Sequence, residues 1–383
     1  MTEKLYHKDS HLHTFQAQVL SCEPGKNGFQ VVLNATAFFP EGGGQAADRG
    51  MLDSVHVLDV HEKQGIIYHT TDKPLSPDST VTGVIDWDLR FDRMQQHSGE
   101  HLISGLVHQK FGYDNVGFHL GDQEVTLDFN GSLTRENLLE IEWAANQAVA
   151  ANFPVEVSYP CQEELASLLY RSKIEIQGQV RIVSFPGYDT CACCAPHVNR
   201  TGEIGLIKVT HVQSHRGGVR VNILCGLRAL KDYREKDASV KEISVLLSAK
   251  EALVAEAVSR LKEEQFTTRG RCMALQEKLL FRELESLPEA SENLSYFFAD
   301  LDANALREFV NQLMARCEGY CAAFLGNDET GYRYIIGSRT QDIRPLGKAL
   351  HKAFKGRGGG KPEMIQGSLP ATQSQILDFL KEA

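Results

Sequence analysis

The chain has 383 residues, 42% hydrophobic and 23% charged, which is ordinary for a soluble globular protein and enough for two or three domains. Apolar runs stay shorter than a membrane span and the polar N-terminus lacks the apolar core of a signal peptide, so nine cysteines indicate a reducing compartment, which we expect to be the cytoplasm. The net charge of −10 repels polyanions as a whole, so nucleic-acid binding would need local basic patches.

Residues 1–90 are predicted to be mostly β. Three stretches have strand-like patterning and are separated by Gly, Asn, Pro and Asp; they are residues 15–20, 28–33 and 55–60. Short strands with frequent turns favour a small barrel or sandwich, and we expect a β-barrel-like domain.

Residues 91–230 mix helices with strands and predict an α+β domain. A helix is expected from about Arg93 to Phe111, and a second from Arg135 to Asn152 with Thr134 as its N-cap. Strands are expected near residues 155–159, 180–185, 203–211 and 218–225.

Residues 231–288 are highly charged, contain one glycine and end at Pro288, which predicts a long helix or a helical hairpin. Its apolar stripe is Val240, Ile243, Leu247, Val254, Val258 and Leu261. This stripe fits either packing within one chain or the seam of a coiled-coil homodimer.

Residues 289–383 predict a separate α/β domain. Helices are expected at residues 303–315 and 345–354, with strands near residues 320–325 and 332–338. The glycine-rich sequence GRGGGKPEMIQGS follows and is expected to form a loop.

Two short spacings point to a metal. His97 and His101 stand four apart in a helical stretch, so both imidazoles would lie on one face, at roughly 2.0–2.1 Å from one zinc ion. Cys193 and His197 repeat the spacing around Pro196, which predicts a loop. Two imidazoles, a thiolate and a third imidazole would complete a tetrahedral zinc site.

The same helix allows a second interpretation. Residues 97–101 read H-x-x-E-H, the pattern of inverzincin proteases, in which Glu100 would be the general base and a distant glutamate the third ligand. In a simpler interpretation, the two histidines are polar residues on one helix face.

Residues 38–45, FFPEGGGQ, are unusual because three glycines let the backbone approach another group closely. No Lys-Ser/Thr follows, which excludes a P-loop. Taken alone, the stretch is more simply a glycine turn between strands.

Together these segments resemble the editing domain of alanyl-tRNA synthetase and its free-standing AlaX-type relatives, and the tail is similar to the C-terminal DHH-associated domain of the same synthetase. The resemblance covers nearly the whole chain. The motifs that carry it, in order, are residues 36–45, 93–101, 193–198, 201–205, 216–220 and 356–368.

The resemblance implies a trans-editing hydrolase that removes serine, and glycine, from mischarged alanine tRNA at a zinc site. The site would have His97, His101, Cys193 and His197 as ligands, with Thr36, Gln45 and Glu41 as candidate catalytic residues. Zinc could position water, polarise the ester or hold the substrate's amino group. A catalytically inactive, zinc-stabilised tRNA-binding module remains the alternative, and the resemblance disfavours the protease.

The tail would bind tRNA. Positive charge gathers around three adjacent glycines, which suits phosphate contacts. The candidate residues are Lys352, Lys355, Arg357, Gly358, Gly359, Gly360 and Lys361, with Lys348 and His351 close by in sequence.

The chain departs from the family pattern in two ways. Where the family usually has Cys-Gly-Gly-Thr-His, this chain has Cys193-Cys-Ala-Pro-His197, so Cys191 and Cys194 compete as the thiolate ligand. The chain also begins at the editing part, with no room for an aminoacylation domain, so we expect it to hydrolyse and not to charge tRNA.

Overall fold

The computed structural model describes residues 1–172, 178–285 and 292–382. It divides into two compact units, Met1–Val240 and Lys241–Ala383. Both combine helices with sheets, which confirms the expected α+β class. Within the described residues, no helix is both long and apolar enough to cross a membrane. The boundary predicted at Pro288 lies outside those residues, and the finer division into four parts stays a prediction.

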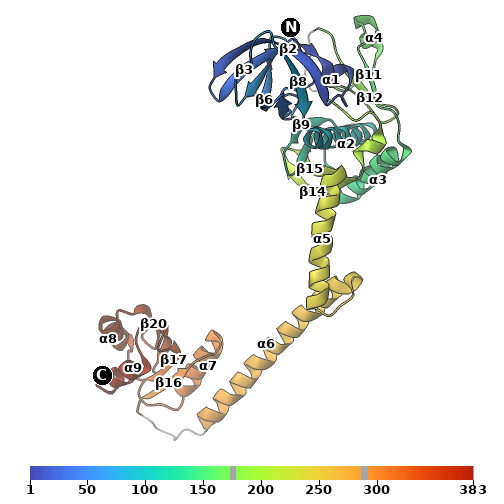
Figure 1. Ribbon diagram of the computed structural model, residues 1–383. Coiled ribbons are helices and arrows are strands. Elements are labelled where there is room, and N and C mark those ends of the chain that lie inside the picture. Colours follow the sequence, from blue (N-terminus) through green and yellow to red (C-terminus); the bar gives the residue numbers. More distant parts are fainter. Residues whose placement is uncertain (173–177, 286–291, 383) are drawn as a thin grey trace. The chain divides into compact units, whose positions relative to one another are not determined.

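The first unit begins with a closed barrel of six strands in the order β2-β3-β7-β6-β5-β8, drawn in blue in Figure 1. Period-two alternation builds its core, since Phe15, Ala17 and Val19 are buried while their neighbours on β2 are exposed. The strands are β2 (Thr14–Gly25), β3 (Gly28–Leu33), β5 (Gly50–Leu52), β6 (Val55–Lys63), β7 (Ile66–Thr71) and β8 (Thr80–Ile85). Beside them lie β1 (Glu3–Lys4), α1 (Leu5–Lys8) and β4 (Ala35–Thr36).

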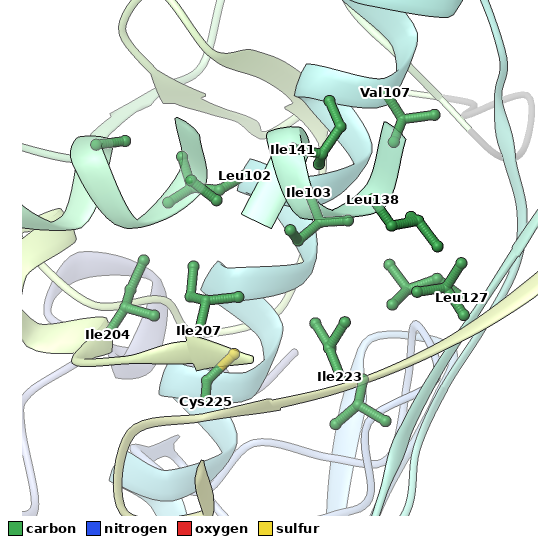
Figure 2. Packing of buried hydrophobic residues seen from close by; sticks show 14 of the residues in the cluster. Leu102, Ile103, Val107, Leu127, Leu138, Ile141, Ile204, Ile207, Ile223 and Cys225 are labelled. Atoms are coloured by element: carbon green, nitrogen blue, oxygen red, sulfur yellow. The ribbon is translucent and has the colours of Figure 1, made fainter. Parts of the chain in front are cut away.

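The rest of this unit is an α+β core. An antiparallel sheet of order β14-β15-β10-β9 packs against two helices, and Figure 2 shows Ile103, Leu138 and Ile223 in their shared cluster. The elements are α2 (Trp87–Phe111), β9 (Asn115–Leu120), β10 (Val125–Phe129), α3 (Arg135–Ala151), β14 (Ile207–His215) and β15 (Gly218–Cys225). Smaller elements are β11 (Glu156–Ser158), α4 (Gln162–Ser167), β12 (Ile182–Phe185), β13 (Asp189–Ala192) and η1 (Thr201–Ile204).

Helix α2 begins six residues before the predicted start, because Asp86 caps it by accepting a hydrogen bond from the Leu89 amide at 3.2 Å. The helix is buried on several sides, and its polar side chains are paired. Gln96 donates to the Cys225 carbonyl at 2.9 Å and accepts from the Cys225 amide at 2.8 Å. The predicted cap of α3 is confirmed, since Thr134 Oγ1 accepts from the amide of Asn137 at 3.2 Å.

The second unit holds a five-stranded sheet of order β16-β17-β18-β20-β19. Apolar side chains of α6 and α7 share one buried cluster with the sheet, and those of α8 and α9 share another. The elements are α6 (Val254–Glu285), β16 (Leu294–Phe298), α7 (Ala303–Leu313), β17 (Cys321–Asn327), β18 (Gly331–Gly337), α8 (Arg344–Phe354), β19 (Arg357–Lys361), β20 (Met364–Leu369) and α9 (Gln373–Glu382).

The sequence predicted a loop for the glycine-rich stretch near the C-terminus. This prediction was wrong, because the stretch forms the hairpin β19–β20. The glycines are needed because the two backbones approach closely: a Cβ on Gly360 would lie 2.2 Å from the carbonyl oxygen of Met364. Gly359, in contrast, faces open space. A run of glycines therefore marks close strand pairing here.

The predicted helical segment consists of α5 (Gly226–Leu246), the short η2 (Glu251–Leu253) and α6. On α6, Leu280 and Leu284 are buried in the cluster that contains α7. Other apolar side chains of α6 are exposed, among them Leu275 at 61% and Leu279 at 65%. This helix therefore carries more apolar surface than its own unit covers.

Candidate metal centre and active site

Helix α2 and the loop after β13 bring four candidate ligands together. His97 and His101 lie one turn apart on α2, with ring centroids 5.5 Å apart. The loop supplies Cys193 and His197, and the His197 ring lies 4.9 Å from His97 and 4.7 Å from His101. One potential ligand atom from each of the four residues lies within 4.8 Å of the others.

The outer nitrogen of each histidine is held by an oxygen. Nδ1 of His97 donates to Gln45 Oε1 at 2.9 Å, that of His101 to Asp189 Oδ2 at 2.8 Å, and that of His197 to the Ala195 carbonyl at 2.7 Å. Each Nε2 is then left as a lone-pair donor, which is the tautomer that a metal requires.

These atoms fit zinc. Nε2 of His101 and of His197 are buried and lack a hydrogen-bond partner anywhere in residues 1–172, 178–285 and 292–382, although Glu100 Oε2 lies 3.9 Å from the former. The His97 Nε2–Cys193 Sγ distance is 3.6 Å. Zinc bonds of roughly 2.0–2.3 Å in a tetrahedron give ligand separations of about 3.3–3.8 Å. Imidazole nitrogen and thiolate sulfur are both atoms that zinc binds in proteins.

The protonation states follow from burial. Burial, followed by the nearby His101 and His97, holds the pKa of His197 well below its usual value, so this ring is neutral and can bind a metal. Burial raises the pKa of the Cys193 thiol, so a metal bound there would have to displace its proton. Of the neighbouring thiols, Cys194 is exposed, and Cys191 joins His101 and Asp189 in a second group.

The glycine turn brings Gln45 to this centre. Gly44 has φ +82°, and a Cβ there would lie 2.8 Å from the carbonyl oxygen of Phe118, so the turn packs tightly on β9. Gln45 is buried, and its Oε1 accepts the hydrogen bond from His97. Its Nε2 is without a hydrogen-bond partner among the described residues, which leaves a donor beside the proposed ligands.

A buried ion pair anchors the turn to α2. Arg90 Nε donates to Asp48 Oδ2 at 2.9 Å, and the Arg90 guanidinium also donates to the Ala37 carbonyl at 2.6 Å. Arg93, one turn later, donates to the Ala47 carbonyl at 2.6 Å. These contacts therefore fix the position of His97 on α2 relative to the segment that carries the glycine turn.

The other two candidate catalytic residues lie in different surroundings. Thr36 is fully buried: its Oγ1 lies 2.8 Å from His69 Nε2 and accepts from the Phe38 amide at 3.1 Å. Since His69 Nδ1 donates to the Val31 carbonyl, His69 Nε2 must accept the hydrogen bond that the Thr36 hydroxyl donates. Glu41 is exposed at the edge of the turn.

Sequence reasoning missed two arginines near the centre. Arg181 donates to the carbonyls of Cys193 at 2.8 Å and Ala195 at 3.1 Å, so it holds the loop that carries two proposed ligands. Arg171 pairs with Asp189, the partner of His101. These arginines lie only 12 to 18 residues before their partners, but in non-helical segments whose pairing no periodicity predicts.

The candidate tRNA residues lie on α8, at its C-terminus and on β19. Lys352, Lys355, Arg357 and Lys361 are exposed, as are Gly358, Gly359 and Gly360. Lys355 has φ +54° at the C-cap of α8 and starts the turn into the hairpin.

Three family models match segments of the chain. The model described as the threonyl and alanyl tRNA synthetase second additional domain matches residues 180–221, which contain Cys193 and His197. The model of class II (A) tRNA synthetases matches residues 4–89, and the DHHA1 domain model matches residues 292–383.

Relatives match nearly the whole chain. The alanyl-tRNA editing protein Aarsd1 of Rattus norvegicus is 28% identical over 95% of this chain and 93% of its own length. The alanine–tRNA ligase of Ignicoccus hospitalis is 28% identical over 94% of this chain, which spans 40% of that ligase. A solved C-Ala domain of Aquifex aeolicus alanyl-tRNA synthetase aligns with 25% of this chain and 96% of its own, at 22% identity and a TM-score of 0.21, too low to support an argument about the fold. These matches confirm the resemblance inferred from the motifs.

Proposed function

We propose that this chain is an alanyl-tRNA editing enzyme, which its similarity to Aarsd1 supports, and that it hydrolyses the ester bond of alanine tRNA that carries serine or glycine. The convergence of three imidazole Nε2 atoms and one thiol supports a zinc-dependent reaction. His97, His101, Cys193 and His197 would hold the ion, and zinc bound there would supply a Lewis acid beside the ester.

Two polar groups of this chain suit recognition of a serine hydroxyl. The Thr36 hydroxyl donates its hydrogen bond to His69 and already accepts one from the Phe38 amide, so toward a substrate it can only accept, through its second lone pair. Gln45 Nε2 can donate one. A site that pairs with a hydroxyl disfavours an analogue lacking it, because the polar groups are then left unsatisfied, and alanine is serine without its hydroxyl. Glu41 stays a weaker candidate because it is exposed on the turn.

The second unit is proposed to hold the tRNA. Lys352, Lys355, Arg357 and Lys361 give a net negative chain a local positive surface. Gly359 leaves the hairpin open on one side, so a phosphate or a base could approach the backbone there. This surface would supply affinity and no chemistry.

The exposed stripe of α6 is proposed to pair two copies of the chain. Its residues follow each other in steps of three and four, the spacing of a coiled coil, and form what we name the α6 seam: Val258, Leu261, Gln265, Thr268, Cys272, Leu275 and Leu279. In a parallel pair, Glu264 meets Arg269 of the second copy. An antiparallel pair aligned on the same seam would bring Lys262 against Arg269 but also Glu264 against Arg271, so its charge contacts offset each other. We therefore propose the parallel arrangement, in which the contact between Glu264 and Arg269 is attractive.

The protease interpretation gains no support from the site. Glu100 Oε1 accepts hydrogen bonds from Ser104 at 2.8 Å and from Asn115 at 2.6 Å, which ties the carboxylate into the core. Cys193 and His197, which have no role in an inverzincin, take the places beside the histidine pair. The inactive tRNA-binding module differs from the proposal only in activity, so hydrolysis of seryl-tRNA with and without zinc tests the proposal.

A further inference from the structure

One of the three histidines has a charged support. Asp189 Oδ2 accepts from His101 Nδ1 at 2.8 Å and from Arg171 at 2.7 Å, while Asp189 Oδ1 accepts from Arg171 Nε at 2.7 Å. His97 is instead held by the neutral amide of Gln45, and His197 by a backbone carbonyl. The two-pronged arginine contact fixes the plane of the carboxylate that holds His101.

The backbone is shaped for this contact. Gly105 lies one turn after His101 on α2, and a Cβ there would lie 2.3 Å from the Tyr188 carbonyl oxygen and 2.6 Å from Asp189 Cβ. Glycine therefore lets the start of β13 reach the helix. Arg171 is clamped by its amide to the Thr190 carbonyl at 2.8 Å and by its carbonyl to the Ala192 amide at 2.9 Å. The guanidinium thereby points at Asp189, and the Arg171 side chain is only 12% exposed.

We propose that Arg171 and Asp189 are positioning residues that orient His101 for the metal of the proposed function. A carboxylate on the outer nitrogen fixes the tautomer and ring direction and makes the inner nitrogen a stronger donor. Arg171 keeps the buried carboxylate charged and in the plane of the imidazole contact. The segment that carries Arg171 thus becomes part of the metal centre without touching the ion.

Zinc affinity, measured by competition with a chromophoric chelator, tests this inference. Loss of such a support costs about 10–100-fold in metal affinity, and we expect this range for Asp189→Asn, because its amide would turn a donor toward either His101 or Arg171. Arg171→Met should weaken zinc binding by about tenfold, and Arg171→Lys, which keeps the charge but not the fork, should weaken it less. The absorption bands of Co²⁺ bound in place of zinc should shift in the same order, which a loss of general stability would not produce.

Asp92→Asn is the matched control. Asp92 lies on α2, the helix of His101, and it also pairs with an arginine, since Arg228 Nε of α5 lies 2.9 Å from both of its oxygens. Asp92 touches none of the proposed ligands. Its zinc affinity and cobalt spectrum should equal those of the unmodified protein. Folded Asp189→Asn and Arg171→Met proteins with unchanged affinity and spectrum would overturn the inference, and the two Arg171 variants decide alone if Asp189→Asn does not fold.

The inference rests on the proposed zinc site, and the outcomes separate the two. An unmodified protein that binds no zinc removes both. An unmodified protein that binds zinc but hydrolyses no aminoacyl-tRNA, while the variants bind zinc more weakly, removes the proposed function and supports the positioning role.

Discussion

At the proposed metal centre, each histidine side chain is defined by what its outer nitrogen touches. The partners are an amide oxygen from the glycine turn, a carboxylate from β13 and a carbonyl from the ligand loop itself. The placement of His97 and His101 on one face could be predicted because both lie on one helix, four residues apart. Asp189 could not, because it stands 88 residues from His101 and its role exists only once β13 packs beside α2.

Thr36→Val should impair the discrimination between serine and alanine. Valine keeps the shape but removes the hydroxyl, so we expect hydrolysis of seryl-tRNA to fall about tenfold, the effect of losing one hydrogen bond of ~1.4 kcal/mol, while the slow hydrolysis of alanyl-tRNA stays unchanged. Rates with the two substrates check this. Thr36→Ser restores the hydroxyl and is the control. Equal rates in the valine variant and the unmodified protein would show that Thr36 is not the discriminator.

His69 should make the barrel sensitive to acid. Burial lowers the pKa of His69 from 6.5 to about 4. Between these pH values the imidazole is protonated in the unfolded chain and neutral in the folded barrel. The free energy of unfolding therefore falls as the pH falls from 6.5 to 4, by up to about 3 kcal/mol from this group.

Denaturant unfolding across that pH range, compared between the unmodified protein and His69→Gln, isolates the effect. Glutamine can still accept from Thr36 and donate to the Val31 carbonyl, but it does not titrate. The loss of stability on acidification should be smaller in the variant. Identical pH profiles would contradict the role assigned to His69.

At the level of whole elements, α2, α3 and most strands could be predicted from periodicity and caps, because those signals are local. The hairpin β19–β20 could not, since consecutive glycines are more often loop residues, and only the pairing of two strands shows why Gly360 must lack a Cβ. The early start of α2 depends on Asp86, a cap that the apolar pattern does not reveal.

The hairpin and the end of α8 should govern the salt dependence of tRNA binding. Removing one cation that pairs with a phosphate lowers the slope of log affinity against log salt by roughly 0.7–0.9, so Lys355→Glu combined with Arg357→Glu should weaken binding and flatten the slope by about 1–2. Binding measured from low to moderate salt checks this. Lys381→Glu, on α9 outside the cluster, should leave the slope unchanged. If Lys381→Glu flattened the slope as much as the double variant, the hairpin would be refuted as a specific tRNA surface.

The α6 seam predicts a parallel pair of chains in register. Cys272 occupies a core position, so the two Cys272 thiols of a pair would face each other and form a disulfide under a mild added oxidant. Electrophoresis without reductant should show a covalent dimer, which Cys272→Ser abolishes although Cys161 and Cys194 are also exposed. Solution mass would separate the arrangements further: a dimeric mass without the cross-link indicates another interface, and a monomeric mass refutes the pairing.

At the scale of the whole molecule, the two units divide the proposed work. The first carries the proposed metal centre at the contact between the barrel and the α+β core, and the second carries the basic surface and the α6 seam. The order of motifs along the chain was enough to predict the resemblance to alanyl-tRNA editing proteins. The contacts that hold the site, such as those of Arg90, Arg171 and Arg181, needed the folded structure because each joins two different elements that no local pattern pairs.

The most direct test of this account is deacylation of three substrates by one preparation of the full chain. Alanine tRNA carrying serine, glycine or alanine is incubated with the protein as purified, after removal of metal by a chelator, and after zinc is returned. We predict that the seryl and glycyl esters are hydrolysed and the alanyl ester is spared, that metal removal stops the reaction, that zinc restores it, and that His101→Ala does not recover. Undiminished hydrolysis of seryl-tRNA by the metal-free protein, or no hydrolysis by protein with one bound zinc per chain, would contradict the account.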